Sequence, residues 1–248
     1  MVYYFLFLID GFGYDQLQNL KNNQSLINTR SGNSNTHCRY VKPILNEIPT
    51  ITSPNWVTIL TGLPVKTHKI MNNAMVGRRN FKFKPSSIFD DQKTSSLFIS
   101  DWKMMFKYIT CKRVKCIYDR KPFVRLMKTW TRHKPKLTVV NTDQLDSIGH
   151  LHGWNSKQFK KKVSKIESFI FKFCKYLQMR KKVKFCIFIT ADHSGYRKNH
   201  ENHNNSSIRK VPIITLSNDI NCYQRVRRRL IKIRRTKQIR NLLQLSIR

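Results

Sequence analysis

The sequence predicts an α/β fold in which helices cover both faces of a mostly parallel central sheet. Two continuous apolar runs, Val2–Ile9 and Lys184–Thr190, are typical of strands that are buried on both faces. Residues 156–177 have apolar side chains at spacings of three and four, which predicts a long amphipathic helix. Strands that alternate with helices favour a parallel sheet, and 248 residues suffice for one sizeable core.

The first quarter of the chain begins with a buried strand and contains one clear helix signal. The strand at Val2–Ile9 ends at Asp10, and the polar residues 22–35 are expected to form a loop. A helix is predicted to start near Pro54, because proline suits a first helical turn, and to end at Gly62. Its N-terminus would lie beside Thr52.

The middle of the chain has weaker periodicity. Residues 64–84 are basic and are expected to be irregular, and residues 86–92 are predicted to form a short capped helix. A strand is expected at Ser96–Ser100. Residues 103–136 have no clean period, and we predict mixed structure with a helix at 123–130.

The second half returns to regular alternation. Residues 137–143 are β-branched and predict a strand, which a loop at 149–154 is expected to follow. Ser156 is the expected N-cap of the long helix. The strand Lys184–Thr190 and a further strand at 211–216 complete the predicted sheet.

The charge of the chain is strongly positive. Lysine and arginine number 48 against 13 acidic residues, which gives a formal net charge of +35. Such a balance favours polyanionic partners: an anionic phosphate-ester substrate, a nucleic acid bound without sequence specificity, or an anionic membrane surface. The alternative is a solvated basic surface with no dedicated partner.

The C-terminal part is basic and amphipathic. We predict a catalytic unit at residues 1–224 and a C-terminal segment at 225–248 that packs on it or is appended to it. Three roles are open for this segment: it closes the sheet, contacts nucleic acid, or rests on a membrane.

The cysteines and the apolar start bear on the compartment. The six cysteines include no CxxC pair, which favours a reducing environment. The apolar start has no basic region before it and no small-residue cleavage site, so we interpret it as a strand and not as a signal peptide. No apolar run reaches the roughly 20 residues of a membrane span, and we expect a cytoplasmic protein. The oligomeric state stays open.

Aspartates and histidines follow the predicted strands in a regular order. The candidates are Asp10 after the first strand, Asp146 and His150 after residues 137–143, Asp192 and His193 after Lys184–Thr190, and His200 in the loop beyond. Their loops are expected to meet at one edge of a parallel sheet, beside Thr52. Mixed carboxylate and imidazole ligands suit zinc or a similar first-row metal, with manganese as the alternative, and they suffice for two ions. Two such ions can clamp both oxygens of a phosphoryl displacement, and Thr52 is the candidate nucleophile.

These motifs together resemble the nucleotide pyrophosphatase/phosphodiesterase family of the alkaline phosphatase superfamily. The motifs that carry the resemblance are Ile9-Asp10-Gly11, the stretch from Pro49 to Trp56, Leu60-Thr61-Gly62, His68, the stretch from Asp146 to His150, Gly153-Trp154, Asp192-His193, His200 and the strand from Val211 to Ile214. The resemblance implies an alkaline-phosphatase-like fold and hydrolysis of phosphodiester or nucleotide pyrophosphate bonds.

The resemblance also implies residue roles. One metal would be held by Asp146, His150 and His200, and the other by Asp10, Thr52, Asp192 and His193. Thr52 would form a phosphothreonine intermediate that water then hydrolyses, and Asn55 would donate a hydrogen bond to a non-bridging phosphate oxygen.

The chain departs from the family pattern at several positions. Ser194, Glu201 and Lys69 stand where the family usually has glycine, and His203 competes with His200 as the loop ligand. Two alternatives to the diesterase are therefore kept: a degenerate homologue that binds nucleic acid, and a phosphomonoesterase of the same superfamily. A sulfatase is disfavoured, because Thr52 replaces the modified cysteine or serine of that chemistry.

Overall fold

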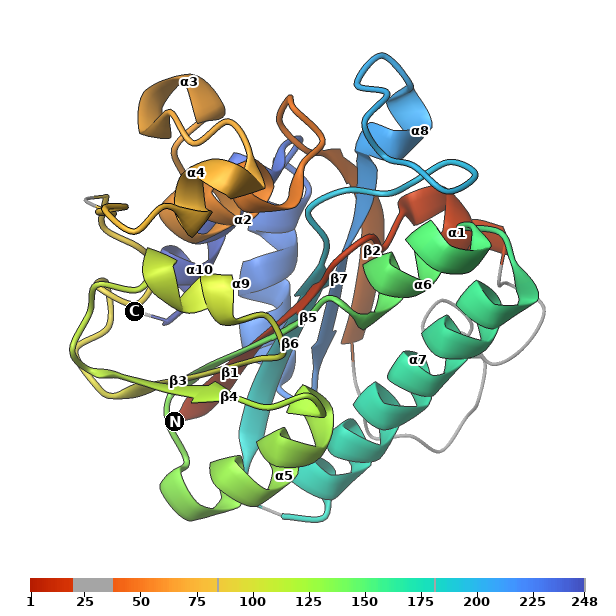
Figure 1. Cartoon of the computed structure of the whole chain (residues 1–248). Coiled ribbons are helices and arrows are strands. Elements are labelled where there is room, and N and C mark those ends of the chain that lie inside the picture. The colour runs from red at the N-terminus through yellow and green to blue at the C-terminus, as the bar shows by residue number, and fades with distance from the viewer. Residues whose placement is uncertain (20–37, 84, 181, 248) are drawn as a thin grey trace.

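The fold is built on one sheet of seven strands in the order β2-β7-β6-β1-β5-β3-β4 (Figure 1). The computed structural model describes residues 1–19, 38–83, 85–180 and 182–247. The strands are β1 (Val2–Ile9), β2 (Cys38–Leu45), β3 (Ser96–Ser100), β4 (Val114–Tyr118), β5 (Leu137–Thr142), β6 (Lys184–Thr190) and β7 (Lys210–Ser217). Among these strands β7 alone runs against the others, because both its pairings, with β6 and with β2, are antiparallel. The predicted mostly parallel α/β fold is confirmed.

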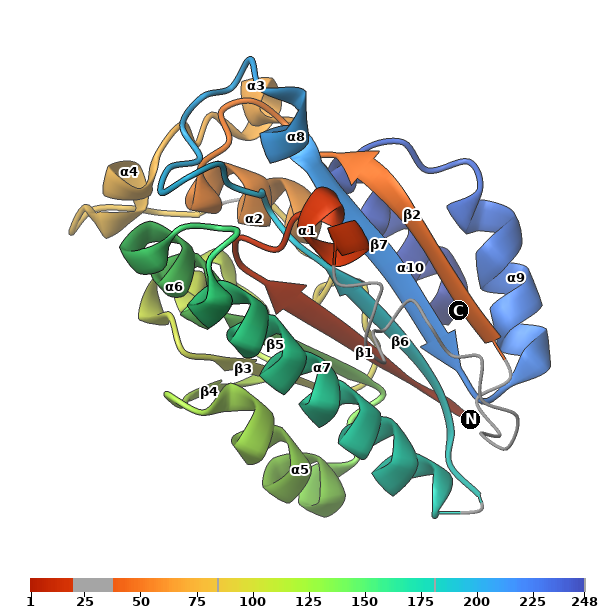
Figure 2. The same ribbon diagram turned by 90° about the vertical axis from the view of Figure 1, so that its right-hand side faces the viewer.

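Helices cover both faces of this sheet. The α-helices are α1 (Tyr14–Asn19), α2 (Thr52–Thr61), α3 (Val65–His68), α4 (Asn73–Gly77), α5 (Pro122–His133), α6 (Gln144–His152), α7 (Lys157–Gln178), α8 (Ser206–Arg209), α9 (Ile220–Leu230) and α10 (Ile239–Ile247), with 3₁₀ turns η1 (Lys103–Tyr108) and η2 (Thr236–Gln238). Helices α5, α6 and α7 lie on one face, and α2, α9 and α10 lie on the other (Figure 2).

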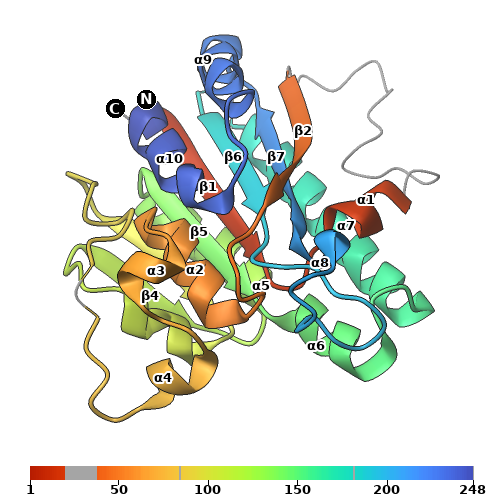
Figure 3. The ribbon, with the colours of Figure 1, turned by 90° about the horizontal axis from the view of Figure 1, so that it is seen from above.

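The apolar sequence of the central strand β1 is explained by side chains that pack on both of its faces. Successive side chains of a strand point to opposite faces. The Phe5 ring packs against Trp130 of α5 and Phe173 of α7, with centroids 5.6 and 5.0 Å apart. On the other face the hydroxyl of Tyr4 donates to the carbonyl of Ser246 in α10. The start of β1 and the end of α10 therefore lie side by side (Figure 3).

Two local predictions were wrong. Residues 149–154 were expected to be a loop, but α6 continues to His152. A glycine inside this helix has a packing reason, because Trp154 folds back onto Gly149 and a Cβ there would lie 2.6 Å from the indole. Residues 86–92 form a turn and not a helix, since the Ser87 amide and hydroxyl both donate to the Asp90 carboxylate, at 2.7 and 2.9 Å.

Other elements were not predicted at all. Helix α1 and strands β2 and β4 were missed, and the irregular stretch 64–84 contains the short helices α3 and α4. The predicted loop at 22–35 lies outside the described residues.

The C-terminal segment closes one face of the sheet. Residue 225 lies inside α9, and the apolar side chains beyond it belong to the same core as β1. These side chains are Val226, Leu230, Ile233, Ile239, Leu242, Leu243 and Ile247. The division of the chain at residue 224 stays a prediction. In the described part of the chain, no helix combines the length and apolar character needed to cross a membrane.

Candidate metal centre and nucleophile

The candidate site lies where three adjacent parallel strands end. Strands β5, β1 and β6 are neighbours, and Ile9 of β1 pairs with Thr142 of β5. Asp10 follows β1, Asp192 lies two residues beyond β6, and Asp146 lies in the first turn of α6. The predicted convergence at the carboxyl edge is thus present in the structure.

The first cluster consists of Asp10, Asp192 and His193, all of which are buried. The Nε2 atom of His193 lies 3.3 Å from Asp10 Oδ1 and 3.3 Å from Asp192 Oδ2. The indole of Trp56 donates to Asp10 Oδ2 at 3.4 Å, and the Gly11 amide donates to Asp192 Oδ1 at 3.3 Å. One oxygen of each carboxylate is thereby held, and the other faces the imidazole.

The second cluster consists of Asp146, His150 and His200. The Nε2 atom of His150 lies 3.4 Å from Asp146 Oδ2, and that of His200 lies 4.0 Å from Asp146 Oδ1. In each cluster the three candidate ligand atoms lie within 4.8 Å of one another. The two clusters adjoin, because the rings of His193 and His200 stack at 3.9 Å and His193 Nε2 lies 3.9 Å from Asp146 Oδ1.

The backbone sets the tautomer of all three histidines. In each ring Nδ1 contacts a backbone carbonyl, at 3.1 Å in His193, 2.6 Å in His200 and 3.0 Å in His150. A carbonyl only accepts, so Nδ1 carries the hydrogen and the lone pair of Nε2 faces the carboxylates. The carbonyls belong to Ser194, Thr50 and Lys198, respectively.

The carboxylates fit a cation. Asp10 Oδ1, Asp146 Oδ1 and Asp192 Oδ2 are buried without a hydrogen-bond donor. Burial, followed by repulsion from neighbouring aspartates, raises the pKa of Asp10 and of Asp192 well above its usual range. Burial also raises the pKa of Asp146 to about 6. Orphaned buried oxygens beside imidazole nitrogens are the donor set that a divalent first-row metal uses.

The histidines are suited to the same purpose. Burial lowers the pKa of His193 well below its usual value, and it lowers the pKa of His200 as well. Both rings are therefore neutral near pH 7, which is the form that binds a metal.

Thr52 faces this site. Its Oγ1 lies 3.3 Å from His193 Nε2, and the residue is buried. Thr52 is the first residue of α2, whose N-cap is Ile51 with no side-chain cap. The hydroxyl is therefore not used as a cap. It lies where amide groups and the helix dipole favour a phosphate.

Asn55 lies beside Thr52, but its side chain serves the preceding loop. Its Nδ2 donates to the carbonyls of Pro49 and Ile51, at 2.8 and 3.1 Å, and its Oδ1 accepts from the Glu47 amide at 3.0 Å. Both amide hydrogens have backbone acceptors, and the residue is fully buried. The predicted hydrogen bond to substrate would require these bonds to break.

Asn73 is a candidate that sequence reasoning missed. Its Oδ1 accepts from the Ser53 amide at 2.9 Å, so its side chain lies at the N-terminus of α2. Its Nδ2 makes no hydrogen bond to the described residues. No local signal marks this asparagine, because it lies 21 positions after Thr52 and only the fold brings the two together.

Asp101 was also missed as a supporting residue. Its carboxylate accepts from the Thr142 hydroxyl at 2.6 Å, the Asp143 amide at 2.9 Å and Gln144 Nε2 at 3.0 Å. These bonds hold the start of α6, the helix that carries Asp146.

The structure shows the surroundings of three positions that depart from the family pattern or compete with it. The Ser194 hydroxyl donates to Gln16 Oε1 at 2.8 Å, and Gln16 Nε2 donates to the Gly195 carbonyl at 3.1 Å, so α1 accommodates the extra side chain. Lys69 has φ of 60°, the left-handed conformation that favours glycine. His203 is turned toward the backbone, since its Nδ1 accepts from the Thr50 amide at 3.1 Å. His200, and not His203, lies in the cluster with Asp146.

Structural comparison finds the same fold in several phosphate-ester enzymes. Murine ectonucleotide pyrophosphatase/phosphodiesterase 5 aligns with 17% identity and a TM-score of 0.58, over 77% of this chain and 57% of the murine chain. The periplasmic domain of phosphoethanolamine transferase EptC from Campylobacter jejuni aligns with 9% identity and a TM-score of 0.63, over 98% and 88% of the two chains. Alkaline phosphatase from the Antarctic bacterium TAB5 aligns with 9% identity and a TM-score of 0.60, over 99% and 98%. At these identities the likeness concerns the fold, and the chain spans little more than half the length of the murine protein.

Sequence comparison assigns the family. A search of curated proteins gave no match. The family model of type I phosphodiesterases/nucleotide pyrophosphatases matches residues 4–104 and 82–209, which together are most of the chain. The resemblance seen in the motifs is thereby confirmed. The chain belongs to the type I phosphodiesterase/nucleotide pyrophosphatase family.

Proposed function

We propose that this protein hydrolyses phosphodiester or nucleotide pyrophosphate bonds with Thr52 as the nucleophile. One observation carries the proposal: the Thr52 hydroxyl lies 3.3 Å from His193, at a helix N-terminus that faces two clusters of metal-ligand type. The family match supports this reaction class.

Two divalent metal ions, most simply zinc, are proposed as cofactors. Asp10, Asp192 and His193 would hold one ion with Thr52, and Asp146, His150 and His200 would hold the other. When bound, such ions stabilise negative charge on phosphate oxygens and lower the pKa of a neighbouring hydroxyl. The orphaned oxygens of the three aspartates support this assignment.

The chain's own residues orient the reaction. The N-terminus of α2 attracts the phosphate, and the Thr52 hydroxyl attacks phosphorus and displaces the leaving alcohol or nucleotide. Because His193 Nε2 would be a metal ligand, the Thr52 proton would pass to water, and a second water would then hydrolyse the phosphothreonine and restore the hydroxyl. Asn73, whose Nδ2 is available, is proposed to donate to a non-bridging oxygen in place of Asn55, whose amide hydrogens are engaged.

The substrate is proposed to be a nucleotide or a similar anionic phosphate ester. An inactive threonine-to-alanine variant of the murine protein has been solved in complex with AMP, which supports both a threonine-dependent reaction and a nucleotide ligand.

The described cysteines other than Cys38 are free thiols, which supports the reducing environment of the cytoplasm.

The test is hydrolysis of bis-p-nitrophenyl phosphate by zinc-loaded protein at low salt. Thr52→Ala should lower kcat by roughly 10³-fold or more, because no other hydroxyl takes the place of the nucleophile. Thr67→Ala, at an exposed position of α3, is the matched control and should keep the wild-type rate. Equal turnover by the wild type and Thr52→Ala would contradict the proposal. Faster cleavage of p-nitrophenyl phosphate than of the diester would favour a phosphomonoesterase.

A further inference from the structure

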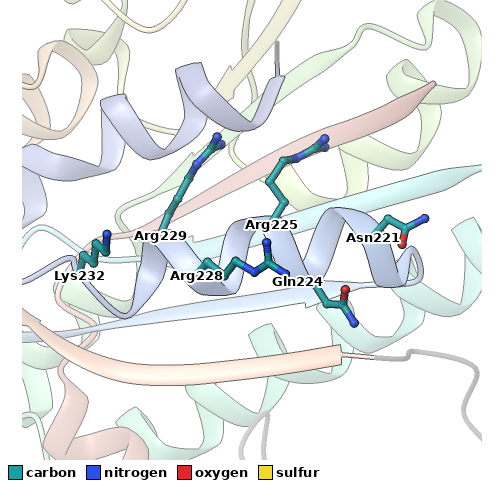
Figure 4. Close-up of a pocket in the computed structure, with 6 residues that line it drawn as sticks. All are labelled: Asn221, Gln224, Arg225, Arg228, Arg229 and Lys232. Carbon is teal, nitrogen blue, oxygen red and sulfur yellow. The ribbon is translucent and has the colours of Figure 1, made fainter.

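The outer face of α9 carries a basic groove that includes none of the candidate metal ligands. The groove has a volume of about 410 Å³ and is lined by six side chains of one helix face (Figure 4). The lining residues are Asn221, Gln224, Arg225, Arg228, Arg229 and Lys232. We call these six residues the α9 stripe.

The α9 stripe follows from the amphipathic sequence of the helix. Its members recur at spacings of three and four, so they share one face. The opposite face, with Cys222, Val226 and Leu230, is buried in the core. At 1.5 Å rise per residue, cations at Arg225, Arg228 and Lys232 extend over roughly 10 Å of helix axis.

Charge in this segment is unbalanced. Residues 220–248 contain no aspartate or glutamate. Some cations of this segment have carboxylate partners elsewhere: Glu47 lies near Arg235 and Lys237, and Asp91 pairs with Arg240. Arg228 and Lys232 are exposed and have no ion pair among the described residues. Two cations one turn apart thus face solvent together.

We propose that the α9 stripe binds the phosphate backbone of a nucleic acid, independently of the metal centre. Guanidinium groups match phosphate oxygens in pairs, and a row of cations along a helix follows a row of phosphates. The asparagine and glutamine of the stripe add neutral donors of the kind that contact phosphates. Recognition is of the backbone and carries no base sequence.

The structure favours nucleic acid over a membrane as the partner. A helix that lies in a membrane interface must insert its apolar face. In α9 that face is occupied by the core, because Val226 and Leu230 are fully buried. Ile220 and Ile231 are about half exposed but stand singly at the ends of the helix, which is ordinary for a soluble surface.

The stripe and the metal clusters lie on different elements of the fold. Helix α9 follows the end of β7, where Ser217 pairs with Cys186 near the start of β6. Asp192 and His193 follow the other end of β6. The helix therefore begins at the sheet edge opposite the metal clusters, and the chain after it leads back to the end of β2, where the Leu45 amide donates to the Arg234 carbonyl at 2.9 Å.

The experiment is a binding titration with a fluorescein-labelled 20-base-pair DNA duplex, followed by fluorescence anisotropy in EDTA. The double variant Arg228→Gln/Lys232→Gln is compared with Lys161→Gln/Lys165→Gln. The control removes the same charge at the same i,i+4 spacing from the exposed face of α7. If the stripe holds two phosphates through these cations, its variant should bind at least about tenfold more weakly at 0.1 M salt. Its slope of log K against log salt should be lower by about 1.8. In the control variant, both the loss of affinity and the decrease in slope should be less than half of those in the stripe variant.

Three results would overturn the proposal. The two double variants could lose the same affinity for the duplex, or the stripe variant could lose none. The stripe variant could also bind the duplex normally and lose affinity only for phosphatidylserine vesicles. Thr52→Ala should bind the duplex like the wild type, and the stripe variant should hydrolyse bis-p-nitrophenyl phosphate at the wild-type rate. Failure of duplex binding is thereby distinguished from failure of the proposed hydrolysis.

Discussion

At the residue scale, the two asparagines near Thr52 have different roles: Asn55 supports the loop before α2, and Asn73 is proposed to contact the substrate. Asn55 makes three hydrogen bonds to the backbone of the loop before α2. Asn73 uses its oxygen on the Ser53 amide and keeps its nitrogen available. The same residue type therefore has a structural role at one position and a proposed catalytic role at the other.

This division can be tested with one substitution at each asparagine. Asn55→Ala leaves buried backbone groups without partners and should lower the free energy of unfolding by about 2–4 kcal/mol. Asn73→Ala should lower stability by about 1 kcal/mol or less, because the residue is partly exposed, but should reduce kcat for the diester by roughly 10²-fold. Urea unfolding and hydrolysis of bis-p-nitrophenyl phosphate measure the two effects. A larger loss of kcat in Asn55→Ala than in Asn73→Ala, with the larger loss of stability in Asn73→Ala, would assign the substrate contact to Asn55.

At the scale of elements, α2 is held at both ends by segments that are distant in sequence. Its C-terminus ends at Gly62 with φ of 71°, and the Arg240 guanidinium of α10 donates to the Thr61 carbonyl at 2.7 Å. The same guanidinium pairs with both oxygens of Asp91, at 3.0 and 2.9 Å. The C-terminal segment therefore braces the helix that carries Thr52, and its removal is expected to affect catalysis.

Arg240→Ala tests this brace. The change leaves the half-buried Asp91 and the Thr61 carbonyl without their donor, and it should lower the free energy of unfolding by about 2–4 kcal/mol. Arg227→Ala, an exposed arginine of α9, is the control and should stay within about 0.5 kcal/mol of the wild type. Chemical unfolding in urea measures both. Equal small effects would mean that α2 does not depend on the C-terminal segment.

At the scale of the whole molecule, the metal clusters couple stability to pH. In metal-free protein the pKa of Asp146 is raised from 3.8 to about 6 by burial. The stability that such a raised pKa contributes is fully present below pH 3.8 and is lost as the pH rises through 6. The raised pKa values of Asp10 and Asp192 extend this loss to higher pH. A divalent ion reverses the loss, because it binds the ionised carboxylates.

We therefore expect zinc to stabilise the protein more at pH 7.5 than at pH 5.5, where protons compete for the carboxylates. At a free concentration 100 times Kd the gain is about 2.7 kcal/mol for one site, or roughly 5–10 °C in Tm. Thermal unfolding with EDTA and with zinc at both pH values measures it. Asp192→Asn should lose most of the gain, and Glu201→Gln, an exposed carboxylate beside His200, should keep it. A zinc effect of the same size at both pH values would contradict this coupling.

Much of the fold followed from patterns that are local. The apolar run of Val2–Ile9 and the spacing from Phe159 to Leu177 predicted a buried strand and a long helix, and both are present. Strand β2 was missed because its alternation is interrupted by Lys42 and Pro43, and its pairing with β7 joins residues that are far apart in the sequence. Helix α6 was not predicted, because Gly149 signals a break and residues 149–154 were expected to be a loop, whereas in the folded chain that glycine makes room for Trp154.

By itself, the sequence determined the α/β class, the family and the order of Asp10, Thr52, Asp146, Asp192 and the histidines, because these depend on residue type and position along the chain. Only the tertiary structure decided which of these side chains meet, since contacts between β1, β5, β6 and α2 join residues more than 40 positions apart. It also decided that Asn73 keeps its Nδ2 available, whereas both amide hydrogens of Asn55 have backbone acceptors. The tertiary structure likewise decided that the basic C-terminal segment braces α2 with one arginine while α9 presents others to solvent. The physical reason is that hydrogen-bond partners and burial are properties of the folded chain.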